Sequence, residues 1–313
     1  MADDLRADLD QLFLEARQRP VFDRLRRRQR AQEVAEIVRQ RMKLKPDGVG
    51  GEGAAGKPRP FDCALALLDP SLLPPRSHLG RPPEWPRRVI MNGLFYVLRS
   101  GLPWRMLPRD FPPVSKVQRY SYTWRDSGVW SAINHLLLMA VRLDAGREAS
   151  PSAGVIGSQS VKTTESGGPR GFDAGKKIKG RKRHILTDTL GLLVAVVVHA
   201  ADIQDRDGAP FVLTAIRASF PWLRHVFADG GYAGEKLETA LIGKGDWTLE
   251  IIKRSDTAKG FELLPRRWVV ERTFAWFGRN RRLAKDFEAT IESSTAWLLL
   301  ASVQLMTRRI ANP

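Results

Sequence analysis

Cysteine, paired histidines and long apolar runs are scarce in this chain of 313 residues. Cys63 is the single cysteine, which excludes an intrachain disulfide and cysteine-based zinc sites and favours a reducing compartment. The five histidines are scattered, with no pair at the spacing of a typical metal site. The most apolar stretches, residues 190–201 and 296–306, are shorter than the roughly 20 residues that span a bilayer. No signal-peptide pattern is visible at the acidic start, so a cytoplasmic protein without a membrane segment is expected.

Two common catalytic motifs are also missing. No G-x-x-x-x-G-K-[ST] phosphate loop and no H-E-x-x-H zinc motif occurs, so we expect no nucleotide cofactor and no zincin chemistry. A G-x-G-x-x-G match at residues 48–53 has no strand before it and no helix after it, and we interpret it as accidental.

Positive charge is what the sequence has in excess. Fifty-one Lys and Arg face thirty-four Asp and Glu, which gives a net charge of +17 and a pI near 10.5. Hydrophobic residues make up 43%, a value typical of a globular protein that buries a sizeable core. The charge favours a polyanionic partner, and nucleic acid is the leading candidate.

Residues 1–57 are expected to form a helical appendage followed by a Gly/Pro-rich linker. Apolar residues recur at helical spacing on both sides of Pro20, and residues 45–60 are rich in glycine and proline. The arginine cluster from Arg24 to Arg30 is either a nucleic-acid contact or a solvated helix face.

Residues 58–150 are expected to form an all-helical DNA-binding module. An apolar stripe runs from Val89 to Leu98 before Gly101, and Ser115 offers a cap for a short basic and aromatic helix. Asp126-Ser127-Gly128 separates that helix from the next one. The pattern is typical of a helix-turn-helix DNA reader. The alternative is a three-helix bundle whose tyrosines and tryptophans fill its core.

Residues 151–313 are expected to form an α/β domain with a mixed sheet. The β-rich stretches and helical patterns alternate in the order βββαβαβα, which is the ribonuclease-H-like order, and a last helix follows at about 291–310. The strands are expected at 155–163, 184–188, 192–200, 222–228 and 247–253, and the helices at 207–220, 234–242 and 265–283.

Two acids stand where such a fold gathers metal ligands. Asp229 ends the fourth strand before two glycines, and Glu271 lies on the polar arc of the long helix among arginines. Both are candidate catalytic and metal-binding residues. The alternatives are an ordinary Asp-Gly turn for Asp229 and a surface ion pair with Arg267 for Glu271.

Basic residues near these features are candidate DNA contacts. The run at 176–183 is expected to lead as a loop into the second strand, and a solvated loop is its alternative. The full set of candidates is Lys116, Arg119, Arg125, Lys176, Lys177, Lys179, Arg181, Lys182, Arg183, Tyr232, Arg267, Arg272, Arg279 and Arg282.

With these motifs, residues 61–313 resemble a bacterial insertion-sequence transposase of the DDE class, of the type numbered five. The resemblance rests on residues 87–113, 158–164, 180–184, 229–234 and 267–283. It implies an enzyme that binds the terminal inverted repeats of its element, cuts the ends and joins them to target DNA. It further implies two Mg²⁺ or Mn²⁺ ions, double-stranded DNA as partner, self-association in the synaptic complex and a nucleoid-associated location.

One position departs from the family pattern. The resemblance places the first acid immediately before Ser158-Gln159-Ser160, where this chain has Gly157. Loss of a carboxylate ligand is expected to impair catalysis, and residues 1–57 fall outside the resemblance. The hypotheses are an active transposase in which another acid or a water completes the site, an inactive DNA-binding protein or repressor at element ends, and a ribonuclease-H-like nuclease unrelated to transposition.

Overall fold

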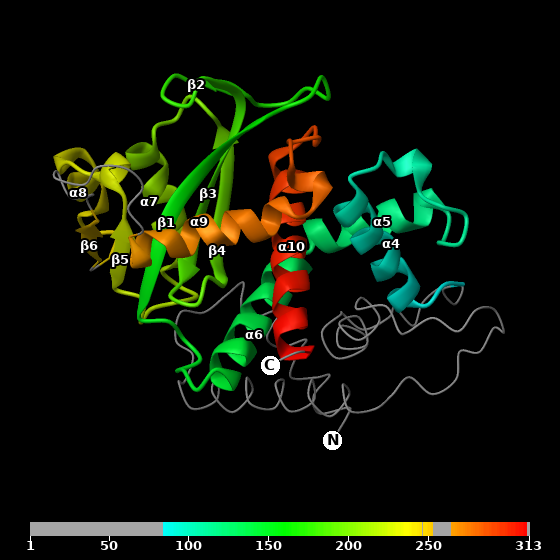
Figure 1. Ribbon diagram of the computed structural model, residues 1–313, viewed down its shortest axis with the longest axis horizontal. Helices are drawn as coiled ribbons and strands as arrows, with labels where there is room; N and C mark the ends of the chain where they lie inside the picture. Colours follow the sequence, from blue (N-terminus) through cyan, green and yellow to red (C-terminus); the bar gives the residue numbers. More distant parts are fainter. Residues whose placement is uncertain (1–83, 246, 253–263, 312–313) are drawn as a thin grey trace. The chain divides into compact units, whose positions relative to one another are not determined.

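The computed structural model describes residues 84–245, 247–252 and 264–311, drawn in colour in Figure 1. Within these ranges the chain divides into two compact units. The first unit contains residues 84–97, 102–149 and 303–311, and the second contains residues 98–101 and 150–302. The predictions for the appendage, the Arg24–Arg30 cluster and the linker lie outside the described residues.

The first unit is helical. It contains most of α4 (Arg87–Ser100), η1 (Trp104–Met106), α5 (Val114–Asp126), α6 (Val129–Asp144) and the end of α10 (Ile291–Ala311). Gly128, with φ of 73°, takes the left-handed conformation that separates α5 from α6, as the turn signal predicts. The cap expected at Ser115 is wrong. The helix begins at Val114, because the carbonyl of Pro113 already accepts a hydrogen bond from the amide of Lys116 at 2.8 Å.

Aromatic side chains fill the space between α5 and α6. Trp124 is buried and meets Trp130 edge-on, with ring centroids 5.6 Å apart, and Tyr120 lies 5.1 Å from Trp124. Lys116 and Arg119 remain exposed on α5. The aromatic residues therefore contribute to the core while the basic residues face solvent, and the helix-turn-helix assignment stays a prediction.

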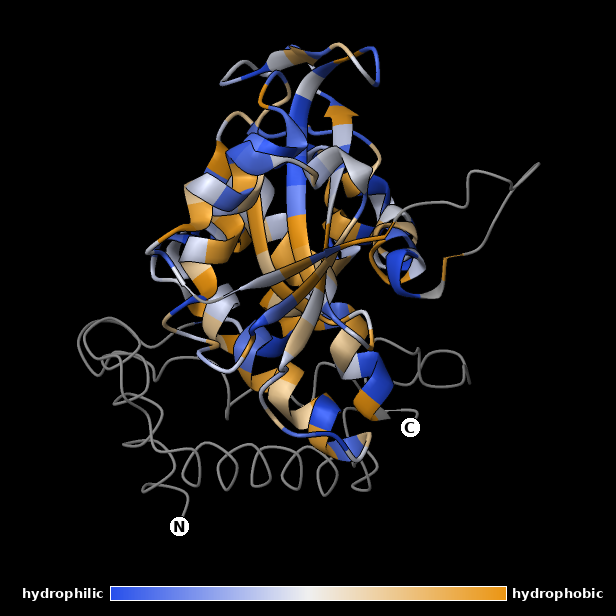
Figure 2. Ribbon diagram, turned by 90° about the vertical axis from the view of Figure 1, so that its left-hand side faces the viewer, coloured by the Kyte–Doolittle hydropathy of each residue, from blue (hydrophilic) through white to orange (hydrophobic). Residues whose placement is uncertain are grey.

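The second unit contains a six-stranded mixed sheet, which confirms the predicted α/β class. Its strands are β1 (Ala153–Lys162), β2 (Gly171–Asp173), β3 (Ile178–Asp188), β4 (Leu193–Ala200), β5 (His225–Ala228) and β6 (Thr248–Ile251). The path runs β2-β3-β1-β5-β6, and β4 also pairs with β3. Strands β1, β2, β3 and β4 pair antiparallel, whereas β1, β5 and β6 pair parallel. The sheet carries both hydrophobic and hydrophilic stretches (Figure 2), and its buried apolar residues include Val155, Ile156, Ile185 and Leu186. The short strand β2 was not predicted.

Helices cover both faces of this sheet. They are α7 (Asp205–Ile216), α8 (Glu235–Leu241) and α9 (Pro265–Gly278), and short turns η2 (Gly230–Tyr232) and η3 (Arg281–Leu283) follow β5 and α9. Figure 1 shows α9 lying across the strands. Val270 of α9 packs at Gly157, whereas Gly208 of α7 packs at His184, the partner of Ser158. Neighbouring strand residues point to opposite faces, so α9 and α7 lie on opposite sides of the sheet.

The helix predicted at 265–283 ends at Gly278, and η3 covers residues 281–283. In the part of the chain that the structure describes, no helix is long and apolar enough to cross a membrane.

Candidate active site

The three acid positions of the predicted site lie in one region of the second unit. Strands β1 and β5 run parallel, and Val155 pairs with Phe227. Gly157 and Asp229 each follow this last pair by two residues, beyond the paired register. Helix α9 packs on β1 and carries Glu271. The three positions therefore lie on or directly after β1, β5 and α9, and their joint role as a site stays a prediction.

A side chain of α9 occupies the space beside the first of these positions, Gly157. Gly157 is buried, and a Cβ atom built on it would lie 2.8 and 3.0 Å from the two Cγ atoms of Val270. Carbon atoms at optimal separation lie about 3.5–4.0 Å apart. The methyl groups of Val270 thus occupy the volume where a side chain at residue 157 would begin.

The remaining two carboxylates are engaged within the protein. Asp229 Oδ1 accepts a hydrogen bond from the amide of Gly231 at 2.8 Å, which closes a turn. Glu271 lies 3.2 Å from Arg267 Nε, and both side chains are almost half exposed. The turn and the ion pair that sequence reasoning held as alternatives are therefore both present.

These residues do not fit a two-ion metal site. Gly157 supplies no ligand, and the space beside it belongs to Val270. Across residues 84–245, 247–252 and 264–311, no three His, Cys, Asp or Glu side chains form a group able to hold a metal ion. Asp229 and Glu271 stay as the candidate ligands of an incomplete set.

A second polar cluster lies on the α7 side of the sheet. Asp205, in the first turn of α7, is 2.8 Å from Lys182 Nζ, 3.8 Å from Lys176 Nζ and 3.6 Å from His184 Nε2. Lys176 Nζ also donates to Ser158 Oγ at 2.9 Å. Burial by itself raises the pKa of Asp205, but the hydrogen bonds from His184 and Lys182 and the nearby lysine charges outweigh it and hold that pKa far below its usual value.

Sequence reasoning missed Asp205. An acid in the first turn of a helix is common, and nothing in the sequence shows that a buried lysine of β3 points at it. Asp205 and Asp229 flank Gly231, whose Cβ position is 3.6 Å from one carboxylate and 3.0 Å from the other. Asp205 is thus an acid close to Asp229, but its charge is already matched by Lys182.

Tyr232 lies in the interior, contrary to its predicted role as a DNA contact. It is 0% exposed, and its ring centroid is 6.0 Å from that of His184. Burial, followed by the negative charges of Asp205 and Asp229, raises the pKa of its hydroxyl well above the ordinary value. The turn η2 directs the ring into the protein rather than outward, so DNA cannot reach it.

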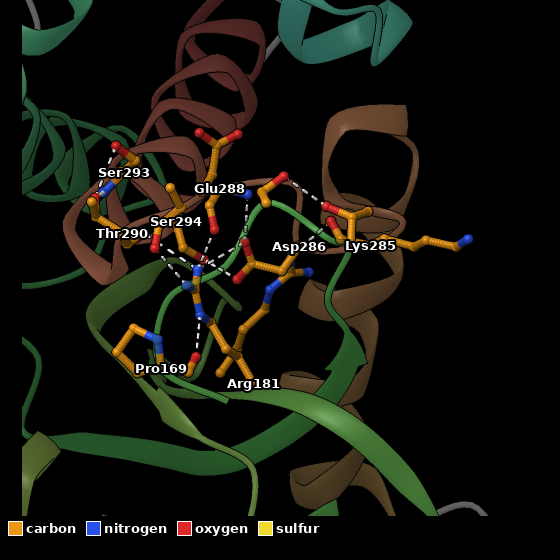
Figure 3. A network of polar contacts seen from close by, with 12 residues as sticks. Pro169, Arg181, Lys285, Asp286, Glu288, Thr290, Ser293 and Ser294 are labelled. Atoms are coloured by element: carbon orange, nitrogen blue, oxygen red, sulfur yellow. Dashed lines mark hydrogen bonds and ion pairs between the residues drawn. The ribbon is translucent and has the colours of Figure 1, made fainter. Parts of the chain in front are cut away.

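The basic run at 176–183 is only partly a surface feature, and its prediction as a loop is wrong from Ile178 onward. Residues Ile178–Arg183 form the start of β3, and Arg181, Lys182 and Arg183 are almost completely buried. Arg181 is the centre of the network in Figure 3. Its guanidinium donates to Asp286 Oδ1 at 3.1 Å and to the carbonyls of Pro169, Glu288 and Ala289 at 2.8–3.0 Å.

The other interior cations have similar partners. Arg183 donates to the carbonyl of Leu283 at 2.8 Å, and burial lowers the pKa of its guanidinium to about 10. Arg282 is 7% exposed and donates to Glu288 at 2.8 Å. Because a buried charge is stable only with partners, these side chains are committed to the protein interior and are not DNA contacts.

The remaining DNA-binding candidates lie at the surface. The exposed ones are Lys116, Arg119, Lys176, Lys177, Lys179 and Arg279, and the partly exposed ones are Arg125, Arg267 and Arg272. Arg125 lies 4.8 Å above the ring of Tyr122, and Arg272 lies 4.8 Å above that of Trp276. Their role in DNA binding stays a prediction.

Comparison with known proteins places this sequence in a family. Residues 148–306 match the family model "Transposase DDE domain", and residues 62–134 match "Putative transposase of IS4/5 family". The chain is 34% identical over 128 residues to the "Putative transposase for insertion sequence element IS402" of Burkholderia cepacia, which covers 39% of this chain and 60% of that protein. It is 32% identical over 117 residues to the "Insertion element IS402 uncharacterized 16.2 kDa protein" of the same organism, which covers 36% of this chain and 78% of that protein.

No solved structure matches the chain. The family model for the DDE domain nevertheless covers half of the sequence and contains Gly157, Asp229 and Glu271. The chain therefore belongs to the insertion-sequence transposases that carry a DDE domain.

Proposed function

We propose that this chain binds the terminal inverted repeats of an insertion sequence, and that its cleavage and strand-transfer activity at those ends is impaired. The observation that carries the proposal is Gly157, which occupies the position where the resemblance places the first acid and which packs against Val270. Membership of the transposase family supports the DNA partner, and the missing carboxylate supports the loss of activity.

The charge of the chain supports binding to DNA. Its net charge is +17, and exposed lysines and arginines lie on α5 and at the start of β3. We assign DNA binding to a helical module at 58–150 and phosphoryl transfer to a ribonuclease-H-like domain at 151–313, as the sequence predicts. Self-association when two ends are paired belongs to the same proposal.

This chain supplies fewer carboxylate ligands for divalent metal ions than the family pattern requires. DDE transposase domains generally use divalent metal ions, and hard cations such as Mg²⁺ prefer several oxygen ligands. Asp229 and Glu271 supply carboxylates, but residue 157 supplies none. Asp205 is an acid close to Asp229, but it lies on the α7 side of the sheet and is held by Lys182.

A catalytically inactive protein that occupies element ends is the second candidate function. The packing of Val270 favours it, because a closed first position is compatible with a folded sheet and an intact DNA-binding surface. Such a protein would compete with active relatives for the same ends and repress their transposition.

An end-cleavage and strand-transfer assay with Mg²⁺ or Mn²⁺ tests the proposal. It compares the natural chain, Gly157→Asp, and Gly157→Asp combined with Val270→Ala, on duplexes that carry the element's own repeats. The combined variant should cut, and adding Asp229→Ala should abolish the cutting. If the natural chain cuts as well as the combined variant, another residue completes the site and the proposal is wrong. Asp205→Asn in the natural chain then tests one acid close to Asp229.

A further inference from the structure

An aromatic side chain on strand β2 is exposed. Phe172 is 55% exposed and pairs across the edge of the sheet with Lys179 of β3. The next residue, Asp173, points to the opposite face, where it accepts a hydrogen bond from Ser160 and lies 3.3 Å from Lys182. Asp173 therefore anchors β2 from within, and this anchoring holds the ring of Phe172 at the surface.

Cations without acidic partners lie at the same end of the sheet as this ring, with Lys179 on its face and Lys162 on the opposite face. We call Lys162, Arg170, Phe172, Lys177 and Lys179 the basic edge; all five are exposed. Among the residues that the structure describes, none of its four cations forms an ion pair. Lys177 is the one described non-glycine residue with a positive φ, 52°, so the turn before β3 holds it in a left-handed conformation.

We infer that the basic edge contacts an opened DNA end, with Phe172 stacked on an unpaired base and the cations on neighbouring phosphates. This inference rests on the proposed function, because it takes DNA as the partner. Lone aromatic rings among cations suit single strands, since every base has a π-face and every nucleotide carries a phosphate. A fully paired duplex already covers the faces of its bases, so the ring requires a base that has left the stack.

The position of the edge relates it to the candidate active site. Lys179 and Ile185 stand six residues apart on β3, hence on the same face, and Ile185 pairs with Gly157. At a rise of about 3.3 Å per residue, the edge lies about 20 Å along the sheet from Gly157. At 3.4 Å per nucleotide pair, that span corresponds to about six base pairs of DNA.

Fluorescence anisotropy with two end duplexes tests the inference. One duplex is fully paired, and the other carries a three-nucleotide mismatch about six pairs from the cleaved end, with 2-aminopurine among the unpaired bases. The proteins are the natural chain, Phe172→Ala, Phe172→Trp and the control Phe211→Ala, which removes an equally exposed ring on α7. Phe172→Ala should bind the mismatched duplex about 10-fold more weakly, should bind the paired duplex unchanged and should lose the quenching of 2-aminopurine.

The outcomes separate this inference from the proposed function. Phe172→Trp should retain both affinity and quenching, and thermal melting should show that Phe172→Ala is folded. If the natural chain prefers element ends to scrambled DNA but Phe172→Ala binds both duplexes normally, the inference fails while the proposed function stands. If the chain does not distinguish ends from scrambled DNA, the proposed function fails. A loss of self-association in Phe172→Ala, with normal DNA binding, would assign the ring to a protein interface instead and overturn the inference.

Discussion

The contact between Gly157 and Val270 makes a measurable prediction about packing. Gly157→Ala places a methyl group 2.8 Å from Val270 Cγ1, so that side chain must move by nearly 1 Å. Overpacking of this kind costs about 1–3 kcal/mol of unfolding free energy. Val270→Ala removes two methyl groups from a buried position and costs about 2 kcal/mol. In the double variant the new methyl enters the space that valine leaves, so the two costs should not add.

A double-mutant cycle measured by denaturant unfolding gives the coupling directly. We expect the double variant to be more stable than the sum of the single effects by about 1–2 kcal/mol. As a control, Val270→Ala combined with Thr248→Ala, on strand β6, should be additive within about 0.5 kcal/mol. If the Gly157 and Val270 changes are also additive within that limit, the two residues are not in contact and our explanation of the closed first position is wrong.

Three other predictions follow from side chains described above. Arg181→Met should lower the unfolding free energy by about 3–5 kcal/mol, because Asp286 is left buried without its cationic partner. The control Lys179→Ala, on the same strand, should change the unfolding free energy by less than about 0.5 kcal/mol. Burial lowers the pKa of His199, so this residue takes up a proton more readily in the unfolded chain than in the folded one. The unfolding free energy should therefore fall as the pH drops below about 6.5, by at most about 1.4 kcal/mol per pH unit. His199→Gln should flatten this pH profile. Lys116→Ala combined with Arg119→Ala should reduce the slope of log affinity against log salt by about 2 for any duplex, and an unchanged slope would exclude these two residues from the phosphate contacts.

Much of the second unit could be predicted from apolar periodicity. The strands at 193–200 and 248–251 and the helices at 235–241 and 291–311 lie within a few residues of their expected positions, since each has a dense apolar pattern bounded by turn signals. Strand β2 was missed because three residues with two glycines close by carry no such pattern. Arg181 and Arg183 were expected at the surface, because charge predicts exposure unless a buried partner is known. Their partners, 283–290, are about 100 residues away in the chain.

In the candidate site, too, some features could be predicted from the sequence and others could not. Asp229 and Glu271 could be found because each follows a recognisable strand or lies on an amphipathic helix, and the absence of an acid at Gly157 could be read directly. The contact of Val270 with Gly157 could not, because it depends on how α9 is rotated against β1. The ion pair between Asp205 and Lys182 could not be predicted either, because it depends on which face of β3 the lysine occupies.

The guanidinium of Arg181 has a consequence for synthesis of the chain on the ribosome. Asp286, which neutralises it, is added 105 residues later. At about 5–20 residues per second, β3 exists for roughly 5–20 seconds before its charge can be matched. During that interval the edge of the nascent sheet must stay hydrated or held by a chaperone. Chains that terminate before residue 286 should therefore be degraded rather than accumulate as half-folded sheets.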